Sequence, residues 1–135
     1  MDRPNLTVTT HDVRRLEALL QGETGRGAPM AALLEQELAR ATLVEPQDVP
    51  AGTVTMHSRV VCQDEDSGER HEIELVYPHE ADADLGRISI LAPVGTALLG
   101  LAVGDAIDWP VPGGRTTRMR VMAVPYQPEA TSLLD

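Results

Sequence analysis

Apolar residues in the first third of the chain recur every three or four positions, which is the spacing of amphipathic helices. A first helix is predicted between Thr9, a suitable cap with Asp12 placed as in a capping box, and Gly22, a suitable stop. A second helix is predicted to begin at Pro29 and to end at the residue before Pro46. The two apolar faces consist of Val13, Leu16, Leu20, Ala31, Leu34, Leu38 and Ala41.

These two helices and the glycine-containing loop between them, residues 22–28, predict an antiparallel helical hairpin over residues 1–45. The hairpin would be a short stub of coiled coil, because each arm reaches only about 15–22 Å at the helical rise per residue. Glu23 and Arg26 stand at its tip and are the candidate functional residues there. A short amphipathic hairpin is compatible with a monomer, and we expect one.

From residue 53 the period changes to two, which indicates β-strands. Residues 53–62 and 73–77 alternate apolar and polar side chains on either side of a turn at Ser67 and Gly68. They predict an antiparallel hairpin with one solvated face, followed by a polar loop over residues 78–86. The inward-facing residues are Val54, Met56, Val60, Cys62, Ile73, Leu75 and Tyr77.

Residues 88–114 combine strand patterns with one short, strongly apolar segment. A strand begins at residue 88, and residues 94–101 predict a helix that is apolar nearly all round and so should be buried against the sheet. A Gly-Asp turn ending at Asp105 leads into a strand over residues 106–111. A Gly-Gly hairpin turn then leads into the last strand, residues 115–126.

Residues 46–135 therefore predict an antiparallel sheet of about five strands against one short helix, which makes the whole chain α+β. The tail after Pro128 is expected to fray. Five glycines in turns and tight connections are expected to set the fold rather than to contact a partner. They are Gly95, Gly100, Gly104, Gly113 and Gly114.

Charge narrows the choice of partners. The chain carries 21 acidic and 11 basic residues, all of the latter Arg, for a net charge of -10. A protein with this balance is repelled by phosphate backbones, so we expect no sequence-specific nucleic-acid binding and at most weak contact with DNA. A basic protein surface is a more plausible partner, although acidity that serves only solubility is the alternative.

Cys62 is the single cysteine, so no disulfide can form within the chain, and we expect it to be a small buried hydrophobe. The first 20 residues lack the pattern of a secretory signal, and no apolar run approaches the length of a membrane span. The expected location is therefore the cytoplasm.

The series in residues 88–114 resembles the C-terminal domain of the Gre transcript-cleavage factors (GreA/GreB), which has an FKBP-like fold. That domain typically carries Ile-Ser, Pro-Ile/Leu-Gly, Ala-Leu-Ile/Leu-Gly, Val-Gly-Asp and Pro-Gly-Gly in this order. The matching positions here are Ile88, Ser89, Pro93, Gly95, residues 97–100, residues 103–105 and residues 112–114.

A closer resemblance, covering nearly the whole chain, is to the Rnk proteins, which are named as regulators of nucleoside diphosphate kinase and carry a shorter helical stub on a Gre-type domain. Further matching positions are Arg3, Pro4, Glu45, Pro46, residues 54–56, 58–60, 75–78, 92–95 and 126–130. The resemblance implies a non-enzymatic regulator that binds bacterial RNA polymerase, covers part of its secondary channel and excludes other channel-binding factors.

In Gre factors an Asp-Ser-Pro segment before the short helix contributes to the polymerase contact. The equivalent positions here are Leu91, Ala92 and Pro93, of which only the proline is retained. Two interpretations stay open: this apolar edge packs on a coiled-coil rim of the partner, or Pro93 only breaks the strand before the helix. Asp105 is a further candidate, although its position favours a turn residue that bonds nearby backbone N–H groups. Gre factors also use acidic residues at the coiled-coil tip to hold a catalytic Mg²⁺. Here Glu23 is the one acid at the tip, so we expect no transcript-cleavage activity.

Other functions find little support in the residues. Prolyl isomerases of the FKBP fold line their pocket with aromatic side chains, whereas this chain has only Tyr77, Trp109 and Tyr126 and no Phe. His57 and His71 lie on facing predicted strands, where ordinary surface histidines are favoured over a shared metal. We therefore expect no catalytic residue, cofactor or metal. The alternative function is a regulatory module that binds nucleoside diphosphate kinase or another enzyme of nucleotide metabolism.

Overall fold

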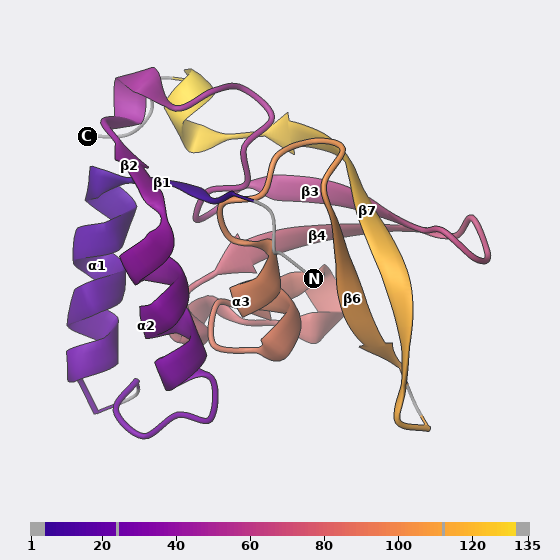
Figure 1. Ribbon diagram of the computed structural model, residues 1–135, viewed down its shortest axis with the longest axis horizontal. Coiled ribbons are helices and arrows are strands. Elements are labelled where there is room, and N and C mark those ends of the chain that lie inside the picture. Colours follow the sequence, from indigo (N-terminus) through magenta and orange to yellow (C-terminus); the bar gives the residue numbers. More distant parts are fainter. Residues whose placement is uncertain (1–4, 24, 112, 132–135) are drawn as a thin grey trace.

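The N-terminal third forms two helices and two short strands. The computed structural model describes residues 5–23, 25–111 and 113–131 of the chain (Figure 1). Its N-terminal elements are β1 (Thr7–Thr9), α1 (Thr10–Gln21), α2 (Ala31–Arg40) and β2 (Thr42–Val44). The two helices lie side by side and run in opposite directions (Figure 1). The predicted first helix is confirmed at both ends, because Thr9 is its N-cap and Gly22 its C-cap.

The second helix is shorter than its sequence pattern predicts. It begins at Ala31 rather than at Pro29 and ends at Arg40 rather than before Pro46. Ala41 is extended, and the next three residues pair in parallel with β1, in the register Thr7↔Thr42. Because this pairing joins segments about 35 residues apart, a local pattern cannot reveal it.

The C-terminal two thirds form a sheet of five strands in the order β5-β4-β3-β7-β6. The strands are β3 (Arg59–Asp64), β4 (Arg70–Val76), β5 (Arg87–Ser89), β6 (Ala106–Val111) and β7 (Arg115–Tyr126). The predicted wholly antiparallel sheet is wrong at one edge, because β4 and β5 run parallel. Two short 3-10 helices, η2 (Pro78–Glu80) and η3 (Ala83–Leu85), bring the chain back so that β5 starts alongside β4.

The segment before β3 is not the strand that its alternating pattern predicts. β3 begins at Arg59, whereas Thr53 forms only an isolated bridge with Ala102 and the chain turns at Met56 and His57. The N–H of Thr55 donates to Ser58 Oγ at 2.9 Å, and His57 adopts a φ of 67°. Val54 and Met56 are nevertheless buried and belong to the core.

One continuous core joins the N-terminal helices to the sheet. α3 (Pro93–Leu98), one residue longer at its start and three shorter at its end than predicted, packs against β5 and β6 (Figure 1). Leu16 of α1, Leu34 of α2, Leu75 of β4 and Leu98 of α3 have no exposed surface and belong to the same apolar cluster. Truncating any one of them to alanine is expected to cost about 2–5 kcal/mol.

The chain after β7 is held by specific contacts, which corrects the prediction of a frayed tail for residues 128–131. These residues form a 3-10 helix, η4 (Pro128–Thr131), that contacts η1 (Pro46–Asp48). Just before it, Gln127 is buried and its side-chain amide donates to the carbonyls of Pro50, at 3.1 Å, and Thr53, at 2.9 Å. In the described part of the chain, no helix is both long and apolar enough to cross a membrane.

Candidate functional site

The three candidate residues before α3 form a short loop fixed by its own neighbours. The N–H of Leu91 donates to Ser89 Oγ, and the N–H of Ala92 donates to the Ser89 carbonyl, both at 3.0 Å. Pro93 occupies the first turn of α3, where its missing N–H costs nothing, and its ring is exposed. Leu91 and Ala92 are half-buried. The loop thus presents a small apolar surface of fixed shape.

Two residues of α3 explain why this loop has a fixed position. Thr96 is buried and its hydroxyl donates to the Ile90 carbonyl at 2.6 Å. Gly95 lies so close to the loop that a Cβ would stand 2.1 Å from the Ser89 carbonyl oxygen. The first turn of α3 can therefore rest directly on the loop backbone only because residue 95 has no side chain.

Asp105 acts within its own turn. Its carboxylate accepts a hydrogen bond from the N–H of Ala102 at 2.9 Å, as expected for a turn residue. The turn is tied to β7, because the N–H of Gly104 donates to the Val121 carbonyl at 2.8 Å and Arg120 donates to the Gly104 carbonyl. The other fold-setting candidates after α3 adopt positive φ, as Gly104 does: Gly100, Gly113 and Gly114.

The tip between α1 and α2 places Glu23 and Arg26 on the surface. Both side chains are exposed, and the guanidinium of Arg26 donates to the carbonyl of Gln21 at 3.2 Å. Gly25 between them is buried, because its backbone packs against the end of α1, where a Cβ would stand 2.1 Å from the Leu19 carbonyl oxygen. The tip therefore offers one exposed carboxylate near one guanidinium.

A polar cluster at the junction of α1 with the sheet was missed by sequence reasoning. We call Asp12, Arg15, His57, Tyr77 and Glu80 the junction cluster. The Asp12 carboxylate does not close the predicted capping box but accepts the N–H of Met56 at 3.1 Å, while the Thr9 hydroxyl accepts the N–H of Asp12.

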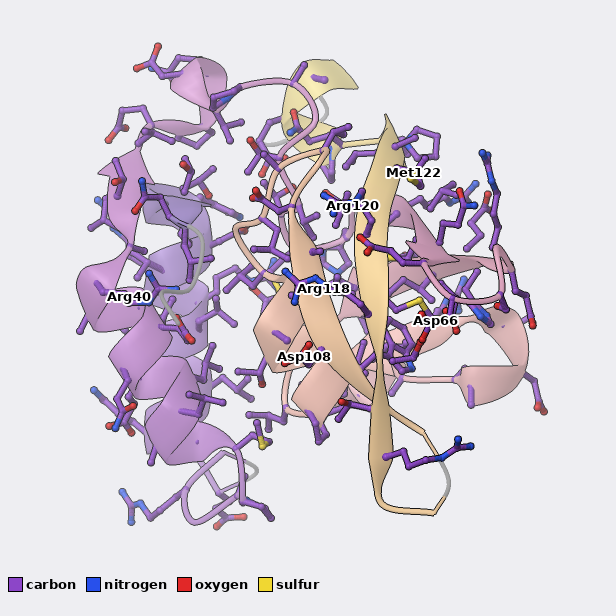
Figure 2. All side chains as sticks on the ribbon, turned by 45° about the vertical axis from the view of Figure 1, so that its right-hand side comes forward. Arg40, Asp66, Asp108, Arg118, Arg120 and Met122 are labelled. Carbon is purple, nitrogen blue, oxygen red and sulfur yellow. The ribbon has the colours of Figure 1, made fainter. Side chains whose placement is uncertain are left out.

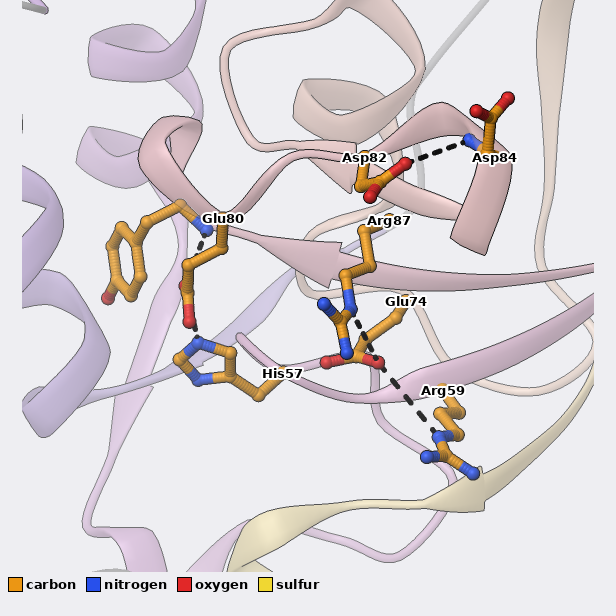
Figure 3. A network of polar contacts seen from close by, with 8 residues as sticks. His57, Arg59, Glu74, Glu80, Asp82, Asp84 and Arg87 are labelled. Carbon is orange, nitrogen blue, oxygen red and sulfur yellow. Dashed lines mark hydrogen bonds and ion pairs between the residues drawn. The ribbon is translucent and has the colours of Figure 1, made fainter.

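The other members of the junction cluster surround Tyr77. The Arg15 guanidinium carbon lies 4.4 Å from the Tyr77 ring centroid, and the His57 ring meets that ring edge-on at 5.5 Å. Glu80 lies 2.8 Å from His57 Nε2 and also accepts the N–H of Tyr77 (Figure 3). No local sequence pattern could predict this cluster, because Asp12 and its partner Met56 are 44 residues apart.

Burial and hydrogen bonding move the pKa values within this cluster in opposite directions. Burial raises the pKa of Asp12 to about 6, although the bond from Met56 lowers it in part. Burial also raises the pKa of the Tyr77 phenol. Burial raises the pKa of Glu80 as well, but the hydrogen bonds from His57 and from the Tyr77 N–H outweigh it and leave that pKa below its usual range.

Ion pairs cover the exposed face of the sheet. Glu74 lies between Arg59, at 4.0 Å, and Arg87, at 3.9 Å (Figure 3). On β6 and β7, Arg118 pairs with Asp108 at 3.4 Å (Figure 2). Each exposed pair contributes little to stability. This face therefore carries interspersed positive and negative side chains that a partner could contact.

The histidines and aromatic residues do not gather into one site. His71 stacks on Trp109 at 6.2 Å between ring centroids, whereas His57 contacts Tyr77. Tyr126 lies near Arg59 instead. Among the described residues no three His, Cys, Asp or Glu side chains are grouped as metal ligands. Cys62 is buried as expected, and burial raises the pKa of its thiol to about 11.

A mixed sheet that carries one short helix behind a rigid proline loop, preceded by two short helices, is the arrangement of a Gre-type domain with a reduced helical part. Two family models match in turn: Rnk N-terminus over residues 4–44, and Transcription elongation factor, GreA/GreB, C-term over residues 49–126. The chain therefore belongs to the Rnk family.

Relatives of known name support this assignment. The "Regulator of nucleoside diphosphate kinase" of Escherichia coli K12 is 42% identical over 130 residues, which cover 96% of each chain. Transcription elongation factor GreA of Rhodospirillum rubrum is 35% identical over 104 residues, 77% of this chain and 62% of that relative. These names are those of regulators and elongation factors rather than of enzymes.

A solved structure extends the likeness to the fold. The protein titled "Prokaryotic transcription elongation factor GreA/GreB from Nitrosomonas europaea" superposes with a TM-score of 0.80 at 46% sequence identity. The match covers 92% of this chain and all of that one. The mixed α+β architecture, with helices at the N-terminus and a Gre-like sheet after them, is thus shared by a protein of similar length.

Proposed function

We propose that this protein is a non-enzymatic transcription regulator that binds bacterial RNA polymerase at the rim of its secondary channel. Residues 46–135 serve as the docking domain, an FKBP-like module, and residues 1–45 serve as a coiled-coil stub that covers part of the channel entrance. The protein acts as a monomer and competes with Gre-type factors for the rim. The observation that carries this proposal is the match to the GreA/GreB C-terminal model, which spans the loop before α3.

Leu91, Ala92 and Pro93 are the proposed contact residues, with Asp105 holding the neighbouring turn. Their support is physical: the loop is fixed by bonds to Ser89, and Pro93 is exposed at its end. An apolar surface that is already ordered loses little conformational entropy on binding. Around it, the net charge of -10 favours a basic partner surface.

The helical stub supports regulation without transcript cleavage. α1 has 12 residues and α2 has 10, so each reaches about 15–18 Å. Glu23 is the one acid at the tip, and Arg26 stands three residues away. A second hard cation is normally held by several oxygen ligands, which this tip does not offer. The protein would occupy the channel entrance and leave the cleavage reaction unassisted.

Co-elution with purified core RNA polymerase, with and without excess GreA, tests this proposal. We expect a stoichiometric complex that GreA displaces. Pro93→Glu should weaken it roughly tenfold, because the exposed ring is lost at the centre of the contact while Glu is accepted at a helix start. Leu85→Glu is the matched control, since Leu85 is 63% exposed at the end of η3.

Three results would contradict the proposal. They are no complex at micromolar concentrations, a complex that GreA does not displace, and stimulated RNA cleavage in a backtracked complex. If Pro93→Glu and Leu85→Glu weaken the complex equally, polymerase binding would still stand. The loop before α3 would then not be the contact surface.

The names of the relatives favour a second candidate function, regulation of nucleoside diphosphate kinase by direct binding. The same co-elution with purified nucleoside diphosphate kinase in place of polymerase separates the two. A complex with the kinase and none with polymerase would select this candidate. A complex with polymerase alone would make any effect on the kinase indirect, through transcription.

A further inference from the structure

A groove on the surface between α1 and α2 has no role in the function proposed above. It encloses about 580 Å³. Leu20 and Leu38 form its floor and are 8% and 9% exposed, and Val13 is half-buried beside them. Leu43 of β2 also lines the groove and is 49% exposed, one of few large apolar side chains in the described residues with so much surface. The groove is thus apolar along its base and open to solvent.

Acidic side chains line the groove. Glu17 of α1 and Glu35 of α2 are exposed lining residues, and no lining residue in the described part of the chain is basic. Arg40, on the same helix as Glu35, forms an ion pair with Glu37 at 2.7 Å. An occupant must therefore combine an apolar face with positive charge.

The dimensions of the groove suit a helix. Val13 and Leu20 are seven residues apart on α1, a separation of about 10 Å, or two helical turns. An amphipathic helix can place apolar side chains at i, i+3 or i+4, and i+7 along such a length. A second copy of this chain is a poor occupant, because a symmetric contact would set Glu17 and Glu35 against acids of the same groove.

We propose that the α1–α2 groove is a docking site for a basic amphipathic helix of a partner protein. Its apolar residues cover Leu20, Leu38 and Leu43, and its Lys or Arg side chains pair with Glu17 and Glu35. This surface is separate from the loop at Leu91 to Pro93, so the protein can hold a helix of one partner while its sheet domain contacts another.

Fluorescence anisotropy with two synthetic helical peptides of 18 residues tests the site. Both peptides carry Leu at every third or fourth position, and their other positions are mainly Lys in one and mainly Glu in the other. We expect saturable binding of the Lys peptide at low salt and none of the Glu peptide. Glu17→Arg with Glu35→Arg should weaken the Lys peptide roughly tenfold, and Leu43→Arg by a similar factor.

The controls match these changes in charge and exposure. Glu69→Arg with Glu72→Arg alters two exposed acids outside the groove, and Leu85→Arg alters a leucine that is 63% exposed. Both should bind the Lys peptide within about twofold of the unaltered protein. Circular dichroism melting of every variant excludes unfolding as the cause of a loss.

The proposal is overturned if both peptides bind alike, if neither binds, or if the controls lose as much affinity as the groove variants. Sedimentation that shows a dimer abolished by Leu43→Arg would assign the groove to a second copy instead. Loss of the polymerase complex in Leu43→Arg but not in Leu85→Arg would assign it to polymerase. Absence of any polymerase complex would defeat the proposed function and leave the peptide result unaffected.

Discussion

The loop before α3 and the junction cluster are both rigid, but they are held in different ways. Leu91 and Ala92 bond to Ser89, two and three residues back, and Gly95 rests on the same carbonyl. Asp12 instead bonds to Met56, on a segment that only the folded chain brings near. A locally held site keeps its shape when distant contacts change, whereas the junction cluster exists only while α1 remains docked on the sheet.

The strongest test of this comparison is Gly95→Ala. Its Cβ would stand 2.1 Å from the Ser89 carbonyl oxygen, so α3 or the loop must move. We expect a loss of roughly 3 kcal/mol in the free energy of unfolding, measured by urea denaturation. Gly22→Ala is the control, because its Cβ would meet ordinary contacts at 3.5 Å and should change stability little. Equal effects would show that the loop is not packed as closely as described.

The pH dependence of stability probes the junction. The pKa of Asp12 is raised from 3.8 to about 6, so the folded state binds its proton more tightly than the unfolded state. This group therefore contributes stability below about pH 4 that is lost as the pH rises through 6, up to about 2–3 kcal/mol.

Comparison of the protein with Asp12→Asn isolates this contribution. The variant is uncharged and retains an acceptor for the Met56 N–H, so it should lack the loss between pH 4 and pH 7. Other carboxyl groups, such as Glu80, act in the opposite direction but are common to both proteins. Parallel pH profiles of the unfolding free energy would contradict the burial of Asp12.

A smaller effect on stability is expected at Gln127, which, like Asp12, bonds to a segment distant in the sequence. Alanine there would leave the carbonyls of Pro50 and Thr53 without their side-chain donor, which should cost about 1–2 kcal/mol in thermal or urea unfolding. Gln36→Ala, on an exposed position of α2, is the matched control and should be nearly neutral. If Gln127→Ala were equally neutral, the end of the chain would not be fastened by this amide.

The smallest expected effect distinguishes two adjacent arginines of α1. Arg15→Ala removes the guanidinium that lies over the Tyr77 ring and should cost about 0.5–1 kcal/mol. It should also raise the pKa of Asp12 further, since Arg15 lowers that pKa in the intact protein. Arg14→Ala is the control on an exposed neighbouring position. Identical melting temperatures for the two variants would show that the contact between Arg15 and Tyr77 does not stabilise the protein.

Several features that depend on near neighbours were determined by the residues themselves. The cap at Thr9, the stop at Gly22 and the last two strands, β6 and β7, follow their sequence patterns residue by residue. The turn at Asp105 does so as well, because its carboxylate bonds an N–H three residues away. Periodicity and turn chemistry act over a few residues, so a single sequence carries them in full.

Only the tertiary structure decided which distant segments meet. The parallel pairing of β1 with β2, the parallel placement of β5 beside β4, and the turns that replace a strand before Arg59 depend on contacts across the fold. The bond from Met56 to Asp12 and the groove lined by α1, α2 and Leu43 arise in the same way. Strand partners and buried acceptors are chosen by the packing of a shared core, and no local period records that choice.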